Sequence, residues 1–152
     1  PYLLKKSGEN AAVIKYTSLK VAAMPESAVN DAVKDMFESY ENPSIGILAH
    51  DTEIELRVTA KAENGVKADE MINKVKLEIK KRLGDNLYGE NEETIHGLLA
   101  KALTAEKLTI STAESCTSGI IAAGLTKTPG SSSYYRGGIN AYSNDVNRRT
   151  WG

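Results

Sequence analysis

The spacing of apolar residues predicts a strand followed by a helix at the start of the chain. Residues 12–22 have extended character, with Thr17, Leu19 and Val21 on one side. Pro25 interrupts this pattern, and Glu26 and Ser27 supply the acidic and capping residues of a helix start. Apolar side chains then recur at helical spacing at Val29, Ala32, Val33, Met36, Phe37 and Tyr40. This helix therefore presents one apolar stripe to a core.

The next pattern is the clearest in the sequence. After a short apolar run at 45–49, residues 54–61 alternate strictly between apolar and polar, which predicts a strand with one wet face. A second amphipathic helix, ending at Gly84, has an apolar side made of Ala68, Met71, Ile72, Val75, Ile79 and Leu83. The order β-α-β-β-α predicts two helices on one face of a small three-stranded sheet, an α+β domain over residues 12–90.

This order also occurs in KH-type modules, which bind nucleic acids. The G-x-x-G loop of such modules is missing, because Gly65 has no glycine three residues further on. We therefore expect a spacer or dimerisation module here, without bound nucleic acid.

Residues 85–93 are polar and contain a glycine, so they are the predicted boundary to a second domain, residues 91–152. There the pattern predicts a helix over 93–106, a strand near 108–112, a helix from 117, a strand over 138–142 and a helix start at 144. Strands that alternate with helices indicate an α/β unit.

Composition and charge narrow the class of protein. The 152 residues are 41% apolar but only 6% aromatic, so the cores are aliphatic. The formal net charge is −2 up to Asn91 and +1 after it, so neither part has the basic character of a nucleic-acid-binding protein. The single cysteine excludes an internal disulfide, and no apolar run is long enough to span a bilayer. We expect a cytoplasmic protein.

The candidate chemistry lies in a turn of small residues around Ser115, between a strand and a helix. Backbone N–H groups at such a helix start can stabilise a developing oxyanion, and Ser115 could be the nucleophile beside them. From the pattern alone a helix cap is the alternative role for Ser115, and serine is more often a cap than a nucleophile at such a position. Cys116 is a rival nucleophile, but neither His50 nor His96 is tied to the turn as its base, so a buried structural cysteine is the preferred interpretation.

Two other site types are not expected. The two histidines have no partners at metal-ligand spacing, which predicts neither a metal site nor a cofactor. Gly119 and Gly124 have the glycine spacing of a P-loop, but Leu125 stands where that motif requires lysine. These glycines are expected to allow close helix–sheet packing.

Several motifs resemble one known family. Residues 112–119, TAESCTSG, look like the TAESCTGG motif of CinA-type competence/damage-inducible proteins, and residues 128–132 and 137–144 resemble the next two motif blocks in order and spacing. Segments 59–62 and 85–90 resemble the middle domain of that family. The opening Pro1-Tyr2-Leu3 resembles the end of its MoaB-like domain, so residues 1–11 are interpreted as a lead-in.

This resemblance implies an activity. In the family, the C-terminal domain is a nicotinamide mononucleotide deamidase, which hydrolyses the carboxamide to nicotinate mononucleotide and ammonia. The resemblance implies that Ser115 is the nucleophile, that Tyr142 assists proton transfer, and that the turn Cys116, Thr117, Ser118 and Gly119 provides oxyanion donors. Gly130, Ser131 and Ser132 are a candidate phosphate site, or a type II turn after Pro129.

Two departures from the family pattern bear on activity. The third catalytic group of the family is a lysine, and Asn147 stands at its position; a neutral amide is not a useful base. Lys127 could replace that lysine only if the fold brings it near. Ser118 stands where the family has glycine.

The ends of the chain look like cuts, so we expect a truncated amidase-like domain and a chain that is itself inactive. The alternative is a non-catalytic interaction or dimerisation module associated with competence or the DNA damage response. In either case residues 92–152 are expected to bury apolar surface against a second copy, as a homodimer, or to remain poorly packed.

Overall fold

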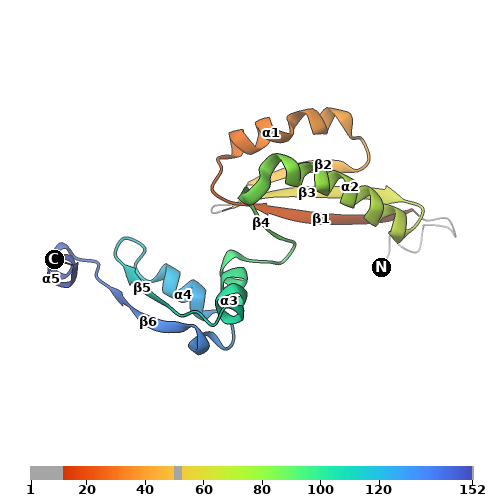
Figure 1. The fold of residues 1–152 in the computed structure, drawn as a ribbon. Helices are drawn as coiled ribbons and strands as arrows, with labels where there is room; N and C mark the ends of the chain where they lie inside the picture. The colour runs from red at the N-terminus through yellow and green to blue at the C-terminus, as the bar shows by residue number, and fades with distance from the viewer. Residues whose placement is uncertain (1–11, 50–52, 152) are drawn as a thin grey trace, which may run out of the picture. The chain divides into compact units, whose positions relative to one another are not determined.

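The computed structural model describes residues 12–49 and 53–151, and the chain divides into two compact units, residues 1–92 and 93–152 (Figure 1). The predicted lead-in at 1–11 and His50 lie outside the described residues. Each unit is a mixture of helices and strands, so the α+β and α/β fold class is confirmed. Within the described residues, no helix combines the length and apolar composition needed to cross a bilayer.

Unit 1 is an antiparallel sheet covered on one face by two helices (Figure 1). Its elements are β1 (Val13–Val21), α1 (Glu26–Ser39), β2 (Ser44–Ala49), β3 (Ile54–Ala62), α2 (Gly65–Leu83) and β4 (Leu87–Glu90). The strand order is β2-β3-β1-β4. The apolar positions predicted from periodicity form the core: Leu19 and Val21 of β1 and Leu56 and Val58 of β3 are buried. Most residues of the two helix stripes are buried with them, and the others, Ala32, Phe37, Tyr40 and Met71, are partly buried against this core.

The sheet has four strands and not the three that were predicted. Residues 87–90, expected to belong to a polar boundary, pair with β1 as an edge strand, with Val21 opposite Leu87 and Leu19 opposite Glu90. Leu87 packs against the core, and Glu90 is held by Lys76 at 2.5 Å. An edge strand tolerates such polar side chains, because only one of its two edges is paired. Its composition therefore resembles that of a linker.

The second face of this sheet carries a buried carboxylate. Glu55 of β3 is only 6% exposed. It accepts hydrogen bonds from Ser18 Oγ at 2.6 Å and from Arg57 Nη2 at 2.7 Å, and Lys20 Nζ lies 3.4 Å away. The hydrogen bond from Ser18, followed by the Arg57 guanidinium, lowers the pKa of Glu55 to about 2 against the opposing effect of burial.

Unit 2 has a parallel β-α-β core. Its elements are α3 (Ile95–Ala105), β5 (Ile110–Glu114), α4 (Ile120–Thr126), β6 (Tyr135–Asn140) and α5 (Asn144–Trp151), with a 3-10 turn at Ser131–Ser133. The strand predicted at 138–142 begins and ends earlier than expected. The helix predicted from 117 begins at Ile120, because the backbone of Ser118 and Gly119 is left-handed, with φ of 51° and 94°.

Few side chains of unit 2 are fully buried. Its apolar cluster consists of Ala100, Leu125 and Tyr134, with Leu103, Ile110 and Tyr135 partly buried around it. The Tyr134 hydroxyl donates to the carbonyl of Leu125 at 2.6 Å, which satisfies its polar end inside this small core.

Candidate active site around Ser115

Glu114, the residue before Ser115, organises the turn. Its side chain is 2% exposed and accepts hydrogen bonds from the N–H groups of Gly119 (3.0 Å), Ile121 (3.0 Å) and Ala122 (2.8 Å). These groups belong to the start of α4, where N–H groups have no partner inside the helix. Burial acts to raise the pKa of the Glu114 carboxyl, but the N–H donors and the Thr117 side chain outweigh it, so this pKa lies below its usual value.

This arrangement reduces the set of expected oxyanion donors. The N–H of Gly119 is engaged by Glu114, and the N–H of Ser118 donates to the carbonyl of Ser115 at 3.0 Å. Within the described residues, the N–H groups of Cys116 and Thr117 form no hydrogen bond. Of the four turn residues predicted to hold an oxyanion, these two are therefore the ones with available donors.

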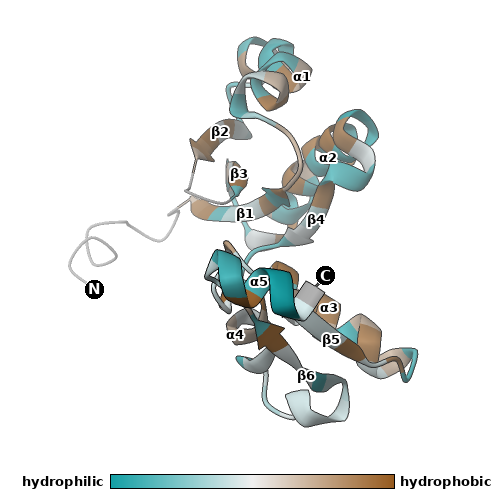
Figure 2. Cartoon of the chain, turned by 90° about the vertical axis from the view of Figure 1, so that its left-hand side faces the viewer, coloured by the Kyte–Doolittle hydropathy of each residue, from teal (hydrophilic) through white to brown (hydrophobic). Residues whose placement is uncertain are grey.

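The Ser115 side chain contacts Asn147, the residue at the position of the family's catalytic lysine. The Nδ2 amide of Asn147, on α5, donates a hydrogen bond to Ser115 Oγ at 2.9 Å. α5 is mostly hydrophilic (Figure 2), and its Val146 is 46% exposed. The hydroxyl of Ser115 is half-buried and accepts a hydrogen bond from its neighbour. A group that donates to the nucleophile cannot at the same time serve as its base.

Tyr142 lies at the same end of the two-stranded sheet as Ser115. Strands β5 and β6 are parallel, with Glu114 opposite Asn140, and the N–H of Ala141 donates to the carbonyl of Glu114 at 2.9 Å. Ser115 and Tyr142 follow the carboxyl ends of these two strands, and such ends meet at one edge. The Tyr142 side chain is 70% exposed, and its hydroxyl has no hydrogen bond within the described part of the chain.

Comparison with known proteins agrees with the motifs around this site. The family model described as the damage-inducible protein CinA KH domain matches residues 17–89, and the model of the CinA C-terminal domain matches residues 92–152. The chain belongs to the CinA family.

Relatives from several bacteria align with nearly the whole chain. A CinA-like protein of Dictyoglomus thermophilum is 41% identical over 149 residues, and a putative competence-damage inducible protein of Clostridium perfringens is 39% identical over 152. The alignments cover 98% and 100% of this chain but 36% of each relative. The chain therefore spans about a third of the length of these relatives.

Two residues of the segment TAESCTSG, residues 112–119, show how the turn is built. Cys116 was expected to be buried, but it is exposed. It is the second residue after β5, in the turn between that strand and α4. Ser118, at the CinA glycine position, has a φ of 51°, a conformation that favours glycine because it has no Cβ.

The candidate phosphate residues lie at the amino ends of the strands of the small sheet, opposite to the end where Ser115 lies. Gly130, Ser131 and Ser132 precede β6, whereas Ser115 follows β5, and the five residues of that strand span about 16 Å. Gly130 has φ 81° and ψ 10°, and the N–H of Ser131 donates to the carbonyl of Thr128 at 3.2 Å. These values match a type II turn. The structure supports the turn interpretation, and it does not bring these residues together with Ser115.

Lys127 is also remote from the nucleophile. It caps the carboxyl end of α4, whose amino end adjoins the Ser115 turn, and this helix spans about 10 Å. Lys127 is therefore not a local substitute for the missing lysine.

His96 has a packing role that sequence reasoning missed. It lies on α3, and a Cβ placed on Gly124 would come within 2.1 Å of its Nε2 atom. Gly124 was expected to allow a helix to approach a sheet, but the close neighbour is the imidazole of another helix. In the described part of the chain, no group of three or more His, Cys, Asp or Glu residues is arranged to hold a metal ion.

The role of Glu114 was also not predicted. The sequence signal was present, since acidic residues are favoured near the start of a helix. It was obscured because Glu114 is the last residue of β5, whereas the first residue of α4 is Ile120. Only the turn that folds back between these two elements brings the carboxylate to the N–H groups of the helix start.

Proposed function

We propose that the C-terminal unit of this chain has the architecture of the CinA nicotinamide mononucleotide deamidase site, and that Asn147 leaves the chain with little or no turnover. The substrate is a carboxamide on a pyridine nucleotide, and the reaction class is amide hydrolysis. The single cysteine suits a reducing compartment, so the cytoplasm is part of this proposal.

The proposed reaction is acyl transfer through Ser115. Its Oγ attacks the amide carbon while its proton passes to a base, and the N–H groups of Cys116 and Thr117 receive the negative charge on the amide oxygen. The amide nitrogen takes up a proton, with the assistance of the Tyr142 hydroxyl, and leaves as ammonia. Water then hydrolyses the ester, which releases nicotinate mononucleotide and restores Ser115.

One contact carries the proposal of low turnover. Residue 147 meets the Ser115 hydroxyl at 2.9 Å, which is the distance at which a base would act. The group found there is an amide that donates its hydrogen. A neutral lysine amine at the same position could accept the proton of Ser115, because a partly desolvated lysine titrates nearer to neutral pH. The contact supports a site whose geometry is retained and whose base is absent.

The decisive experiment measures ammonia release from nicotinamide mononucleotide by the unaltered chain and by Asn147→Lys. We expect turnover to rise by at least about tenfold in the variant, as is typical for restoring a general base. Asn144→Lys is the matched control, because it adds the same side chain at the start of the same helix and should leave turnover unchanged. Adding Ser115→Ala to Asn147→Lys should remove the gain.

Two results would contradict the proposal. Turnover by the unaltered chain that Ser115→Ala abolishes would show that no lysine is needed at position 147. A folded Asn147→Lys variant that binds nicotinamide mononucleotide without turnover would show that the remaining residues do not form a deamidase site.

A non-catalytic interaction module is the second candidate. It is favoured by apolar side chains that unit 2 leaves exposed, including Ile120 (70%), Leu108 (57%) and Ile139 (55%). Such side chains are typical of surfaces that another copy or a partner covers. Sedimentation of the chain over a range of concentrations tests the homodimer, and Ile120→Lys should shift the equilibrium toward monomer.

A further inference from the structure

Strand β2 forms an edge of the unit 1 sheet without the usual protection. Within the described residues it pairs with β3 on one side only. Its six residues, SIGILA, include no charged side chain and no proline. Edge strands normally carry such residues because an unpaired edge offers N–H and C=O groups to other chains. The opposite edge strand, β4, does carry a charged residue, Glu90, which is paired with Lys76.

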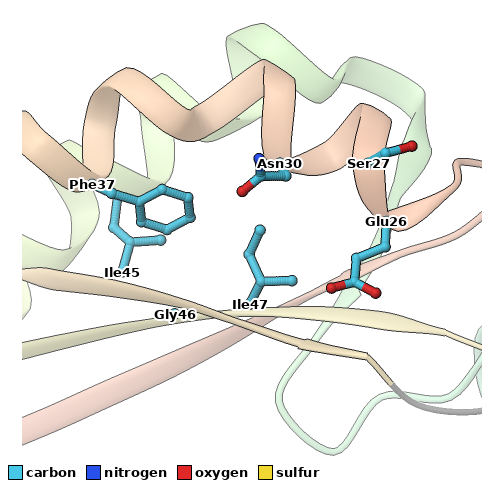
Figure 3. A pocket seen from close by; sticks show the side chains of 7 residues that line it. All are labelled: Glu26, Ser27, Asn30, Phe37, Ile45, Gly46 and Ile47. Atoms are coloured by element: carbon cyan, nitrogen blue, oxygen red, sulfur yellow. The ribbon is translucent and has the colours of Figure 1, made fainter.

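A groove runs between this strand and α1 (Figure 3), with a volume of about 500 Å³. Ile45 and Ile47 rise from β2 toward the helix, and the Phe37 ring of α1 lies beside Ile45. The register places Ile45 opposite Val58 and Ile47 opposite Leu56, both of which are buried, so the groove adjoins the helix-covered face of the sheet. All three groove side chains are only partly buried.

The rim of the groove is polar and acidic. Glu26, Ser27 and Asn30 of α1 line it and are exposed. The helix contains four acidic residues and a single lysine. Asp31 is paired with Lys34 and Asp35 with Arg82, whereas Glu26 and Glu38 have no ion-pair partner among the described residues. The unpaired carboxylate at the rim favours a cationic neighbour and disfavours phosphate groups.

We propose that the groove between α1 and β2 binds an extended peptide segment of a partner protein, which adds a fifth strand beside β2. The free edge of β2 supplies backbone hydrogen bonds, and the groove takes apolar side chains at alternate positions of the peptide. Lysine or arginine next to those positions pairs with Glu26. A second copy of the chain fits less well, because it would bring another α1 of the same negative charge to the groove.

The probe is a fluorescent peptide with the sequence Lys-Val-Thr-Val-Thr-Val-Lys, and binding to the chain is followed by fluorescence anisotropy. Glu26→Lys should weaken binding by about tenfold and should strengthen binding of the counterpart with glutamate at both ends. Asp31→Lys is the matched control: it makes the same charge change on the same helix, outside the groove, and should change affinity by less than about twofold.

Methylation of the peptide backbone tests the strand geometry without altering the protein. In a strand, N–H groups point alternately to the two sides, so only one side faces β2. Of two peptides methylated at alternate sets of nitrogens, one should retain affinity and the other should lose it. Three results would each overturn the proposal. The first is equal binding by both peptides, and the second is an equal effect of Glu26→Lys and Asp31→Lys. The third is a chain that does not bind the peptide and instead forms dimers that Ile47→Lys disrupts.

Discussion

The two units of the chain differ most in how their structures are held together. In unit 1, fourteen buried apolar side chains from the sheet and both helices form one cluster. In unit 2 the corresponding cluster has three, and several large apolar side chains remain exposed. Hydrophobic burial scales with the area removed from water, so it stabilises unit 1 far more strongly. Unit 2 depends to a greater extent on hydrogen bonds.

Among the described residues, each unit also buries one glutamate, and the two carboxylates are held by different kinds of group. Glu55 in unit 1 is held by side chains, namely Ser18, Arg57 and Lys20. Glu114 in unit 2 is held mainly by backbone N–H groups of a turn and a short helix. The first carboxylate joins two strands that the core already fixes. The second shapes the turn that presents Ser115, so in unit 2 the buried charge belongs to the candidate site itself.

The largest expected effect comes from the unit 1 core. Leu56→Ala should lower the free energy of unfolding of unit 1 by about 3 kcal/mol, because it leaves a cavity in the centre of the sheet. Leu77→Ala is the matched control: Leu77 is 61% exposed on α2, and its removal should cost less than about 0.5 kcal/mol. Hydrogen exchange followed by mass spectrometry reads each unit separately. Similar losses for both variants would show that the cluster is not the main source of stability.

The next largest effect is the dependence of stability on pH that each buried glutamate causes. The pKa of Glu55 falls from 4.5 to about 2 on folding. Its ionised form therefore contributes stability above pH 4.5, and this contribution, about 3 kcal/mol at most, is lost as the pH falls toward 2. Denaturation of unit 1 should be less pH-dependent over this range in Glu55→Gln.

The lowered pKa of Glu114 has the same sign, so unit 2 should also lose stability as the medium becomes more acidic. Glu114→Gln provides the comparison. An unchanged acid profile for both variants would show that neither carboxylate gains from its buried partners.

The smallest effect concerns the turn that follows Ser115. Ser118→Gly should stabilise unit 2 by about 0.5–1 kcal/mol, because glycine adopts a φ of 51° without steric cost. Ser132→Gly is a suitable control, since that residue lies in the 3-10 turn and has no left-handed backbone. Thermal unfolding of both variants measures the difference. Destabilisation by Ser118→Gly would indicate that the hydroxyl makes contributions beyond the backbone geometry.

Local patterns predicted unit 1 better than unit 2. The alternation at 54–61 and the stripes of α1 and α2 were confirmed, because a large apolar face must be buried and its period determines which face that is. β4 was missed because an edge strand needs few apolar residues. In unit 2 the strand at 135–140 was placed too late, since its exposed, glycine-rich sequence has no strong period.

The sequence by itself determined the family through the ordered motifs around Ser115, the course of the main helices and strands, and the identity of residue 147. Tertiary structure alone decided that Asn147 reaches the Ser115 hydroxyl, that Glu114 occupies the N–H groups of α4, and that residues 130–132 and Lys127 lie away from the nucleophile. The reason is physical. Periodicity records which side of an element faces a core, whereas a hydrogen bond between residues 32 positions apart depends on how the intervening strand and helix fold back.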